Sequence, residues 1–110
     1  MSNINCKNGL RPTVVIIGAG VCGLSIGWQL AEAGAKVTIV EKSEPGRGAT
    51  WAAAGMLAAR AEAEPGEQAL LNLNLKSQEY WPEFRNRLEK ATGVPISYRD
   101  DGTIIVALDR

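Results

Sequence analysis

The sequence predicts an α/β fold: one βαβ unit, then a long amphipathic helix and the start of an antiparallel sheet. Three observations support this fold class. Two β-branched runs flank a segment of helical periodicity within residues 13–40. Residues 67–91 carry apolar side chains at mostly three- and four-residue steps, with charges between them. Two β-prone runs, residues 94–98 and 103–108, flank an Asp-Gly pair, which predicts a hairpin.

The first part of the chain predicts strand, helix and strand in that order. Residues 13–17 form a continuous apolar run, typical of a strand buried on both faces of a parallel sheet. From Val21 the apolar spacing becomes helical, and Gly34 stands where a C′ glycine would end the helix. A second β-branched run, residues 36–40, ends at Glu41. Together these segments predict a βαβ unit.

Residues 43–48 hold one proline and two glycines, so they predict a loop. Thr50 precedes an alanine-rich stretch, residues 51–59, and is predicted to be the N-cap of a further helix. The Pro65-Gly66 pair then predicts a break in the chain.

The long amphipathic helix over residues 67–91 is interrupted by Pro82. A proline inside a helix removes one hydrogen bond and clashes with the preceding turn. We therefore expect a kink near Gln78, or two helices with Pro82 in the first turn of the second. Gly93 is the predicted stop.

The composition excludes several classes of function. The 110 residues contain 12 Lys and Arg, 12 Asp and Glu, and no His. A net charge of zero disfavours nucleic acids and anionic membranes as partners, because both need a basic patch. Without His there is no His-centred triad and no His-bearing zinc site, and we predict no metal site.

The cysteine content and the apolar runs predict the compartment. Cys6 and Cys22 are too few for a disulfide framework, which indicates a reducing, cytoplasmic location. Residues 1–12 lack the apolar region of a signal peptide, so they are predicted to be a short tail. The sequence contains no run of eighteen apolar residues, so it predicts no membrane span.

A glycine motif follows the first predicted strand and opens the helix: Gly18-Ala19-Gly20-Val21-Cys22-Gly23, which fits G-x-G-x-x-G. Gly18 would allow the tight turn, Gly20 the close approach of backbone to a pyrophosphate, and Gly23 the close packing of helix on strand. The N–H groups at the helix start suit phosphate oxygens. Glu41, roughly twenty residues on, suits ribose hydroxyls, and its charge would repel the 2′-phosphate of NADP. The motif predicts dinucleotide binding and leaves FAD and NAD open.

A second informative segment follows the glycine motif. Residues 47–58 read Arg-Gly-Ala-Thr-Trp-Ala-Ala-Ala-Gly-Met-Leu-Ala. Together with residues 15–41, it resembles the D-amino acid oxidase superfamily of FAD-dependent oxidoreductases, closest to the glycine oxidase branch of thiamine biosynthesis. The resemblance covers nearly all of residues 13–108. It implies the fold of a glutathione-reductase-type flavoprotein, with a Rossmann-like FAD-binding unit.

The resemblance also implies which residues contact FAD. The contacts fall into four groups: Val21 and Cys22 on the pyrophosphate, Glu41 and Lys42 on the adenosine, Ala49 and Thr50 on the phosphate and ribityl region, and Ala54, Gly55 and Met56 along the isoalloxazine. The substrate-binding Arg and Tyr of the family would lie beyond residue 110. No catalytic residue is therefore assigned.

For the whole protein, the resemblance implies oxidative deamination of glycine, sarcosine or a small D-amino acid to an imine and an oxo acid. Dioxygen would be the electron acceptor, and hydrogen peroxide the by-product. Residues 13–93 would be the N-terminal part of the FAD-binding domain, and residues 94–110 the beginning of the substrate domain. A homo-oligomer is one of the states left open for the full-length protein.

Three alternatives remain at this point. The first is a D-amino acid dehydrogenase or a sarcosine oxidase relative, the dehydrogenase passing electrons to a quinone. The second is an NAD-dependent dehydrogenase, and the third is a non-catalytic nucleotide-binding module. We expect residues 1–110 expressed alone to be poorly soluble, flavin-free and inactive, because a partial sheet leaves its edges exposed.

Overall fold

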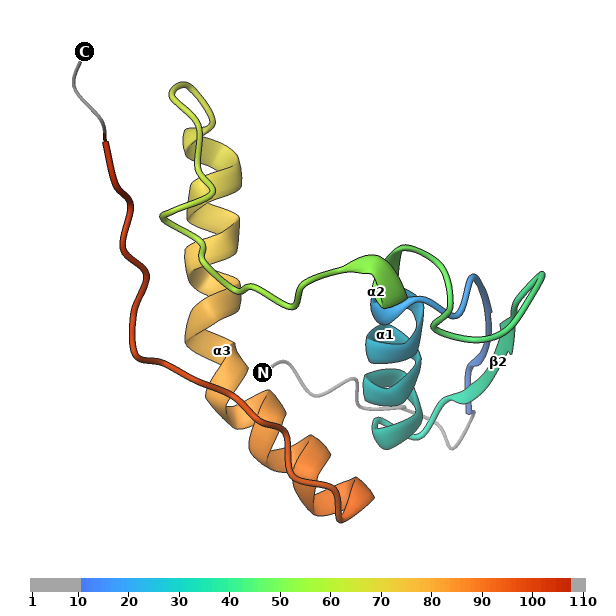
Figure 1. The fold of residues 1–110 in the computed structure, drawn as a ribbon. Coiled ribbons are helices and arrows are strands. Elements are labelled where there is room, and N and C mark those ends of the chain that lie inside the picture. The colour runs from blue at the N-terminus through green and yellow to red at the C-terminus, as the bar shows by residue number, and fades with distance from the viewer. Residues whose placement is uncertain (1–10, 108–110) are drawn as a thin grey trace. The chain divides into compact units, whose positions relative to one another are not determined.

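The computed structural model describes residues 11–107, which divide into two compact units at the Gly55–Met56 boundary. Most of the predicted N-terminal tail and the end of the second β-prone run, Leu108, lie outside the described residues. Residues 11–107 contain five elements: strand β1 (Thr13–Ile17), helix α1 (Val21–Glu32), strand β2 (Lys36–Val40), helix α2 (Ala49–Ala52) and helix α3 (Gln68–Thr92) (Figure 1). The first four belong to the first unit and α3 to the second.

Strands β1 and β2 pair in parallel, with Thr13 opposite Lys36 and Ile17 opposite Val40. The ladder continues one step past β1, where the Gly18 N–H donates to the Val40 carbonyl at 2.8 Å. Strand, helix and parallel strand therefore form the predicted βαβ unit.

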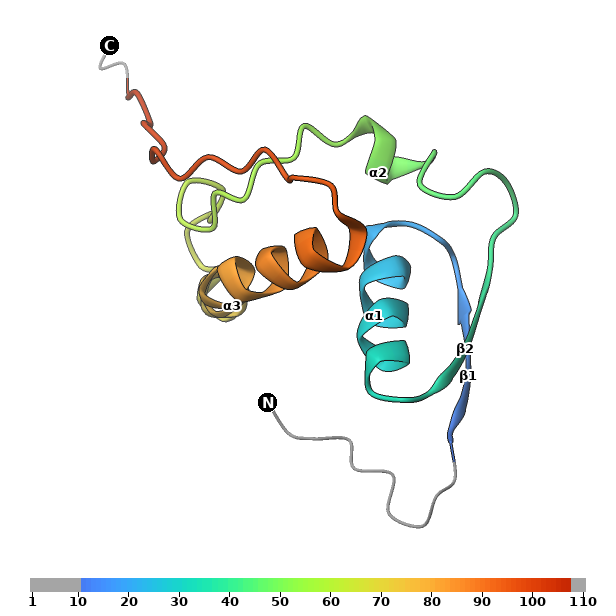
Figure 2. The same ribbon diagram turned by 90° about the horizontal axis from the view of Figure 1, so that it is seen from below.

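Helix α1 covers one face of this strand pair (Figure 2). Gly27 is buried against the sheet, where an added Cβ would lie 2.9 Å from Ile39 Cδ1. On the opposite face Val15 is 61% exposed and Ile17 is 89% exposed. The prediction that the first strand is buried on both faces is therefore wrong for the described residues, because α1 covers only one of them.

Helix α1 ends as its sequence predicts. Ala33 is the last helical-like residue, and Gly34 follows with φ +93°, a conformation that side chains with a Cβ rarely adopt. The Gly34 N–H donates to the Ala31 carbonyl at 2.9 Å. Gly34 is the C′ glycine that the spacing predicts.

Helix α2 differs from its prediction. It begins at Ala49, has Gly48 as its N-cap and contains only four residues. Thr50 is therefore inside the helix and is not its N-cap. Its hydroxyl instead accepts the N–H of Val21, at the start of α1. Ala53 is already extended, at ψ 138°, so most of the alanine-rich stretch is not helical.

Helix α3 is continuous from Gln68 to Thr92, with Pro82 inside it. Figure 1 shows the helix axis changing direction between the gold first half and the orange second half. The structure thus contains a kink and not two separate helices. Gly93 ends the helix at φ +68°, and its N–H donates to the Glu89 carbonyl at 2.8 Å.

The predicted hairpin after α3 is not formed: the described residues 94–107 contain no strand. The first run is instead held on α3, where the Ile96 N–H donates to Glu89 Oε1 at 2.8 Å. The Tyr98 ring lies 6.0 Å from the Trp81 ring, centroid to centroid. In the second run Ile104 is 90% exposed. A lone two-stranded hairpin is marginal in water, and these contacts on α3 compete with it.

We expect Gly93→Ala to lower the free energy of unfolding by about 1 kcal/mol, because a Cβ disfavours the left-handed conformation. Urea unfolding of the intact protein measures this change. Gly48→Ala is the matched control, since Gly48 has φ −89° and an added Cβ would meet nothing within 4 Å. An equal loss in both variants would contradict the role of the Gly93 backbone conformation.

Candidate functional site

Most of the predicted cofactor residues of the first unit gather where β1 and β2 end. The turn after β1 leads directly into α1, and α2 lies at the N-terminal end of α1 (Figure 1). Gly18 opens this turn at φ +102°, with nothing within 4 Å of an added Cβ. In α/β sheets, ligands bind outside the carboxyl ends of the strands, which is the position of this turn.

The N-terminus of α1 offers backbone donors at this position. Gly20 is the N-cap and supplies no side-chain cap, and the first intrahelical bond runs from the Leu24 N–H to the Gly20 carbonyl at 2.9 Å. The N–H groups of Cys22 and Gly23 precede that bond, so they have no partner within the helix. With the positive end of the helix dipole, they make a cradle that suits a pyrophosphate.

The Thr50 side chain ties α2 to this cradle. Its Oγ1 accepts the Val21 N–H at 2.9 Å. An added Cβ at Gly20 would lie 3.2 Å from the same oxygen, so a glycine there lets the hydroxyl approach. The Val21 N–H is therefore engaged by Thr50, while the hydroxyl keeps its own hydrogen for another acceptor.

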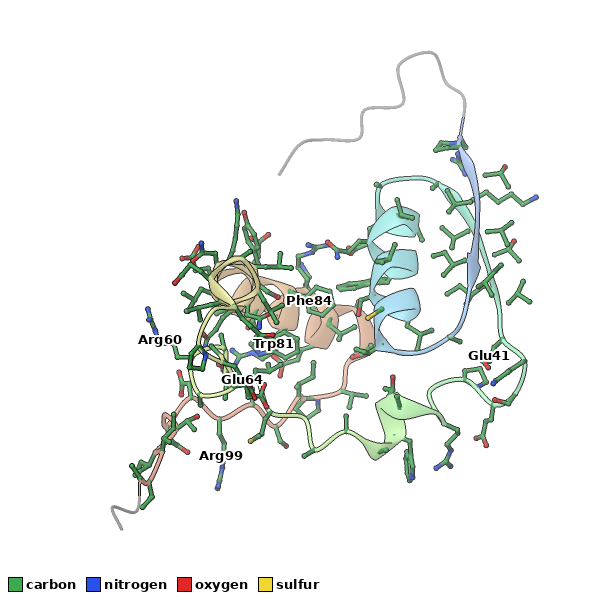
Figure 3. All side chains as sticks on the ribbon, turned by 90° about the horizontal axis from the view of Figure 1, so that it is seen from above. Glu41, Arg60, Glu64, Trp81, Phe84 and Arg99 are labelled. Carbon is green, nitrogen blue, oxygen red and sulfur yellow. The ribbon has the colours of Figure 1, made fainter. Side chains whose placement is uncertain are left out.

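Glu41, directly after β2, connects two loops through its carboxylate (Figure 3). Oε2 accepts the Ala19 N–H at 2.8 Å. Oε1 accepts the Ser43 N–H at 3.1 Å and the Ser43 hydroxyl at 3.3 Å. The Ala19 N–H, followed by the Ser43 N–H, holds the pKa of the Glu41 carboxyl below its ordinary value. The group is thus an ionised acceptor at neutral pH.

Ala19 links the glycine turn to the loop after β2. It is only 3% exposed, and its carbonyl accepts the Gly46 N–H at 2.9 Å. Both peptide groups of Ala19 are thereby held by residues 41–46. The sequence pattern does not mark Ala19 or Ser43 as site residues, because each occupies an unspecified position in a motif or loop. The Pro45-Gly46 pair does indicate a turn at this point of the loop, and Gly46 indeed adopts φ +75°.

The remaining predicted residues are placed less closely together. Lys42 and Ala49 are exposed neighbours of Glu41 and Thr50. Three others lie at the unit boundary: Ala54 and Gly55 end the first unit, and Met56 begins the second. Within the second unit, Met56 lines a hollow of about 160 Å³ together with Gln78 and Trp81. The contacts of Lys42, Ala49, Ala54, Gly55 and Met56 with FAD stay predictions.

The exposed Trp51 side chain has a local partner. The Arg47 guanidinium carbon lies 4.0 Å from the centroid of the Trp51 ring. The Arg47 Nε also lies 3.2 Å from Glu44 Oε1. Arg47 is thus held by a cation–π contact and an exposed ion pair within the loop.

Two further properties concern the whole described part of the chain. Among residues 11–107, no group of three or more His, Cys, Asp and Glu side chains is placed to hold a metal ion. None of the helices in this range is both long enough and apolar enough to cross a membrane.

Comparisons with known proteins give the family. The family model described as FAD dependent oxidoreductase matches residues 13–110. A glycine oxidase of Geobacillus kaustophilus is 39% identical over 97 residues, 88% of this chain and 26% of that protein. The bifunctional protein ThiO/ThiG of Trichormus variabilis is 42% identical over 85 residues, 77% of this chain and 13% of that protein. The mitochondrial dimethylglycine dehydrogenase of Rattus norvegicus is 37% identical over 99 residues, 88% of this chain and 10% of that protein.

The chain thus spans about a quarter or less of the length of these relatives. No solved structure gives a significant match. The family match agrees with the glycine turn, the carboxylate after β2 and the resemblance noted in the sequence. The chain belongs to the family of FAD-dependent oxidoreductases, whose cofactor is FAD.

Proposed function

We propose that the intact protein carrying these residues oxidises glycine, sarcosine or a small D-amino acid, with dioxygen as electron acceptor. One observation carries the proposal: the assembled glycine turn, Glu41 and Thr50 occur in a chain that is 39% identical to a glycine oxidase. The name of the ThiO/ThiG relative supports the same branch.

The proposal gives each part of the site a role in holding FAD. The start of α1, with Val21 and the N–H groups of Cys22 and Gly23, binds the pyrophosphate, and the Thr50 hydroxyl donates its hydrogen to a phosphate oxygen. The ionised Glu41 carboxylate accepts hydrogen bonds from the ribose hydroxyls. Ala54, Gly55 and Met56 follow the flat ring system, where small side chains and a φ of +79° at Gly55 let backbone approach.

The chemistry of the proposed reaction belongs to the cofactor, which accepts a hydride from the substrate when bound. The amine substrate loses two electrons and two protons and becomes an imine. Water hydrolyses the imine to an oxo acid and releases ammonia, or methylamine when the substrate is sarcosine. Dioxygen takes up the two electrons and two protons as hydrogen peroxide. The described residues position the cofactor for this exchange. Groups that bind the substrate are not assigned among residues 1–110.

A second candidate follows from the dimethylglycine dehydrogenase relative, which is 37% identical over 99 residues. The name of that relative specifies an N-methylated amine and a dehydrogenase. In this alternative the substrate is a methylated glycine, and the electrons pass to an acceptor other than dioxygen. This candidate keeps the same FAD site and differs only in the substrate and the acceptor.

We expect the intact protein to form hydrogen peroxide when glycine, sarcosine or D-alanine is added, measured with a peroxidase-coupled dye under air. Dimethylglycine is the comparison substrate. Substrate-dependent reduction of an artificial acceptor without peroxide would contradict the oxidase and favour the dehydrogenase. Reduction of NAD in place of either would contradict the FAD chemistry of both candidates.

A further inference from the structure

We propose that Ser43 is a positioning residue that holds the Glu41 carboxylate in the orientation that receives the ribose of FAD. The inference rests on the proposed function, because it assumes that Glu41 binds the ribose. It goes further in assigning a role to a residue outside the glycine motif and outside residues 47–58, to which no contact with FAD is assigned above.

The contacts come from two sides of the carboxylate. The Ser43 N–H and the Ser43 hydroxyl both point to Oε1, at 3.1 and 3.3 Å. The Ala19 N–H points to Oε2 at 2.8 Å. Ala19 is the buried residue of the glycine turn, so the carboxylate is held between the phosphate-binding turn and the loop after β2.

Holding the side chain matters because Glu has three rotatable bonds. A free Glu side chain would lose this rotational freedom when the ribose binds, and that loss weakens binding. Donors from the protein fix the rotamer before the ribose arrives. Ser43 supplies the donors on Oε1, and its hydroxyl can turn toward whichever oxygen needs it.

The charged neighbours do not replace this contact. Glu44 pairs with Arg47 at 3.2 Å, and Lys42 is exposed beside Glu41 in the chain. The carboxylate thus receives its side-chain hydrogen bond from the neutral Ser43 hydroxyl and not from the charged side chains beside it. Alanine at position 43 would keep the backbone N–H and lose only the hydroxyl, whereas threonine would keep both donors.

The test compares Ser43→Ala, Ser43→Thr and the control Ser97→Ala, an exposed serine of the segment after α3, in the intact protein. Two quantities are measured: the pKa of the Glu41 carboxyl by ¹³C NMR after flavin removal, and the FAD dissociation constant by flavin fluorescence. We expect Ser43→Ala to raise the pKa of Glu41 and to weaken FAD binding by about threefold to tenfold. Ser43→Thr restores both quantities, and Ser97→Ala changes neither.

A double-mutant cycle with Glu41→Gln separates positioning from a general structural effect. Without the carboxylate, Ser43→Ala should weaken FAD binding no further. An equal loss in both backgrounds, or an unchanged pKa of Glu41 in Ser43→Ala, would overturn the positioning role. If Glu41→Gln itself leaves FAD affinity unchanged, the ribose contact of the proposed function fails as well. If Glu41→Gln weakens FAD binding as expected but Ser43→Ala leaves FAD affinity unchanged, only the positioning role of Ser43 is overturned.

Discussion

Gly23→Ala is expected to reduce FAD affinity by about a hundredfold or more. An added Cβ at this position would lie 2.0 Å from the Gly18 carbonyl oxygen and 3.3 Å from Ile16 Cγ2. The nearest atom is backbone, so a side-chain rotation cannot relieve the contact. The start of α1 must move away from the glycine turn, which separates the Cys22 and Gly23 donors from the phosphates. Losing hydrogen bonds to a charged group costs about 1.5–3 kcal/mol each.

A graded series of alanine substitutions tests this explanation. Gly27→Ala meets Ile39 Cδ1 at 2.9 Å, which is the end of a flexible side chain, and alanine favours the helix by roughly 1 kcal/mol. We expect Gly27→Ala to keep FAD with only a small change in stability. Gly48→Ala meets nothing within 4 Å and should bind FAD as the parent does. Circular dichroism monitors folding of each variant, and normal FAD binding by a folded Gly23→Ala would contradict the proposed geometry.

Glu41→Gln should weaken FAD binding by about tenfold or more, because an amide cannot replace the carboxylate. The carboxylate accepts the Ala19 N–H on one oxygen and two Ser43 donors on the other. Glutamine has one oxygen and one NH₂ group, so its NH₂ must face either the Ala19 N–H or the Ser43 donors. At least one donor of the protein therefore loses its acceptor, and a ribose hydroxyl loses its charged acceptor. Fluorescence titration with FAD measures the change.

Protonation of the same carboxylate should weaken both FAD binding and folding stability at acid pH, a loss that we call the acid limb. The N–H groups of Ala19 and Ser43 lower the pKa of Glu41 below its ordinary value of 4.5. A group whose pKa is lower in the folded state stabilises that state above its unfolded pKa. This contribution should therefore be complete above about pH 4.5 and disappear as the pH falls through the lowered value. Glu41→Gln should lack this component.

Glu44→Gln is the matched control for both measurements. Glu44 lies in the same loop and forms an exposed ion pair with Arg47, a kind of contact that contributes little. We expect its FAD affinity and acid limb to match those of the parent. The same loss in Glu44→Gln and Glu41→Gln would show that the charge of the loop, and not the Glu41 site, governs binding.

The βαβ unit was predictable because its signals are local. The apolar runs of β1 and β2, the change to helical spacing at Val21 and the C′ position of Gly34 all depend on near neighbours in the chain. The start of α2 was not predictable in this way. Thr50 reads as an N-cap, but its hydroxyl is used by the N–H of Val21, 29 residues away in the chain.

Two other differences have a tertiary origin. Val15 and Ile17 have the pattern of a strand covered on both sides, yet α1 covers only one face of the described sheet. Residues 94–98 have the pattern of a strand, but Tyr98 and the Ile96 N–H contact α3 instead. Propensity alone does not reveal such partners, because a strand needs neighbours on its edges and faces.

Within the candidate site, the glycines and Glu41 were predictable from a motif with a known physical reason for each residue. Ala19 and Ser43 were not, because alanine and serine occur in many turns without this role. Their part depends on distances of 2.8 to 3.3 Å to one carboxylate. Gly23 and Gly27 lie four residues apart on one helix face, a signal of close packing that the spacing alone could have indicated.

Hydrogen–deuterium exchange of the intact, flavin-stripped protein, with and without FAD, tests most directly whether these residues hold the cofactor. The account predicts that FAD slows amide exchange in peptides covering residues 18–24 and 41–50, which contain the cradle, Glu41 and Thr50. Unchanged exchange in residues 18–24 on FAD binding would contradict the assignment of this cradle to the pyrophosphate.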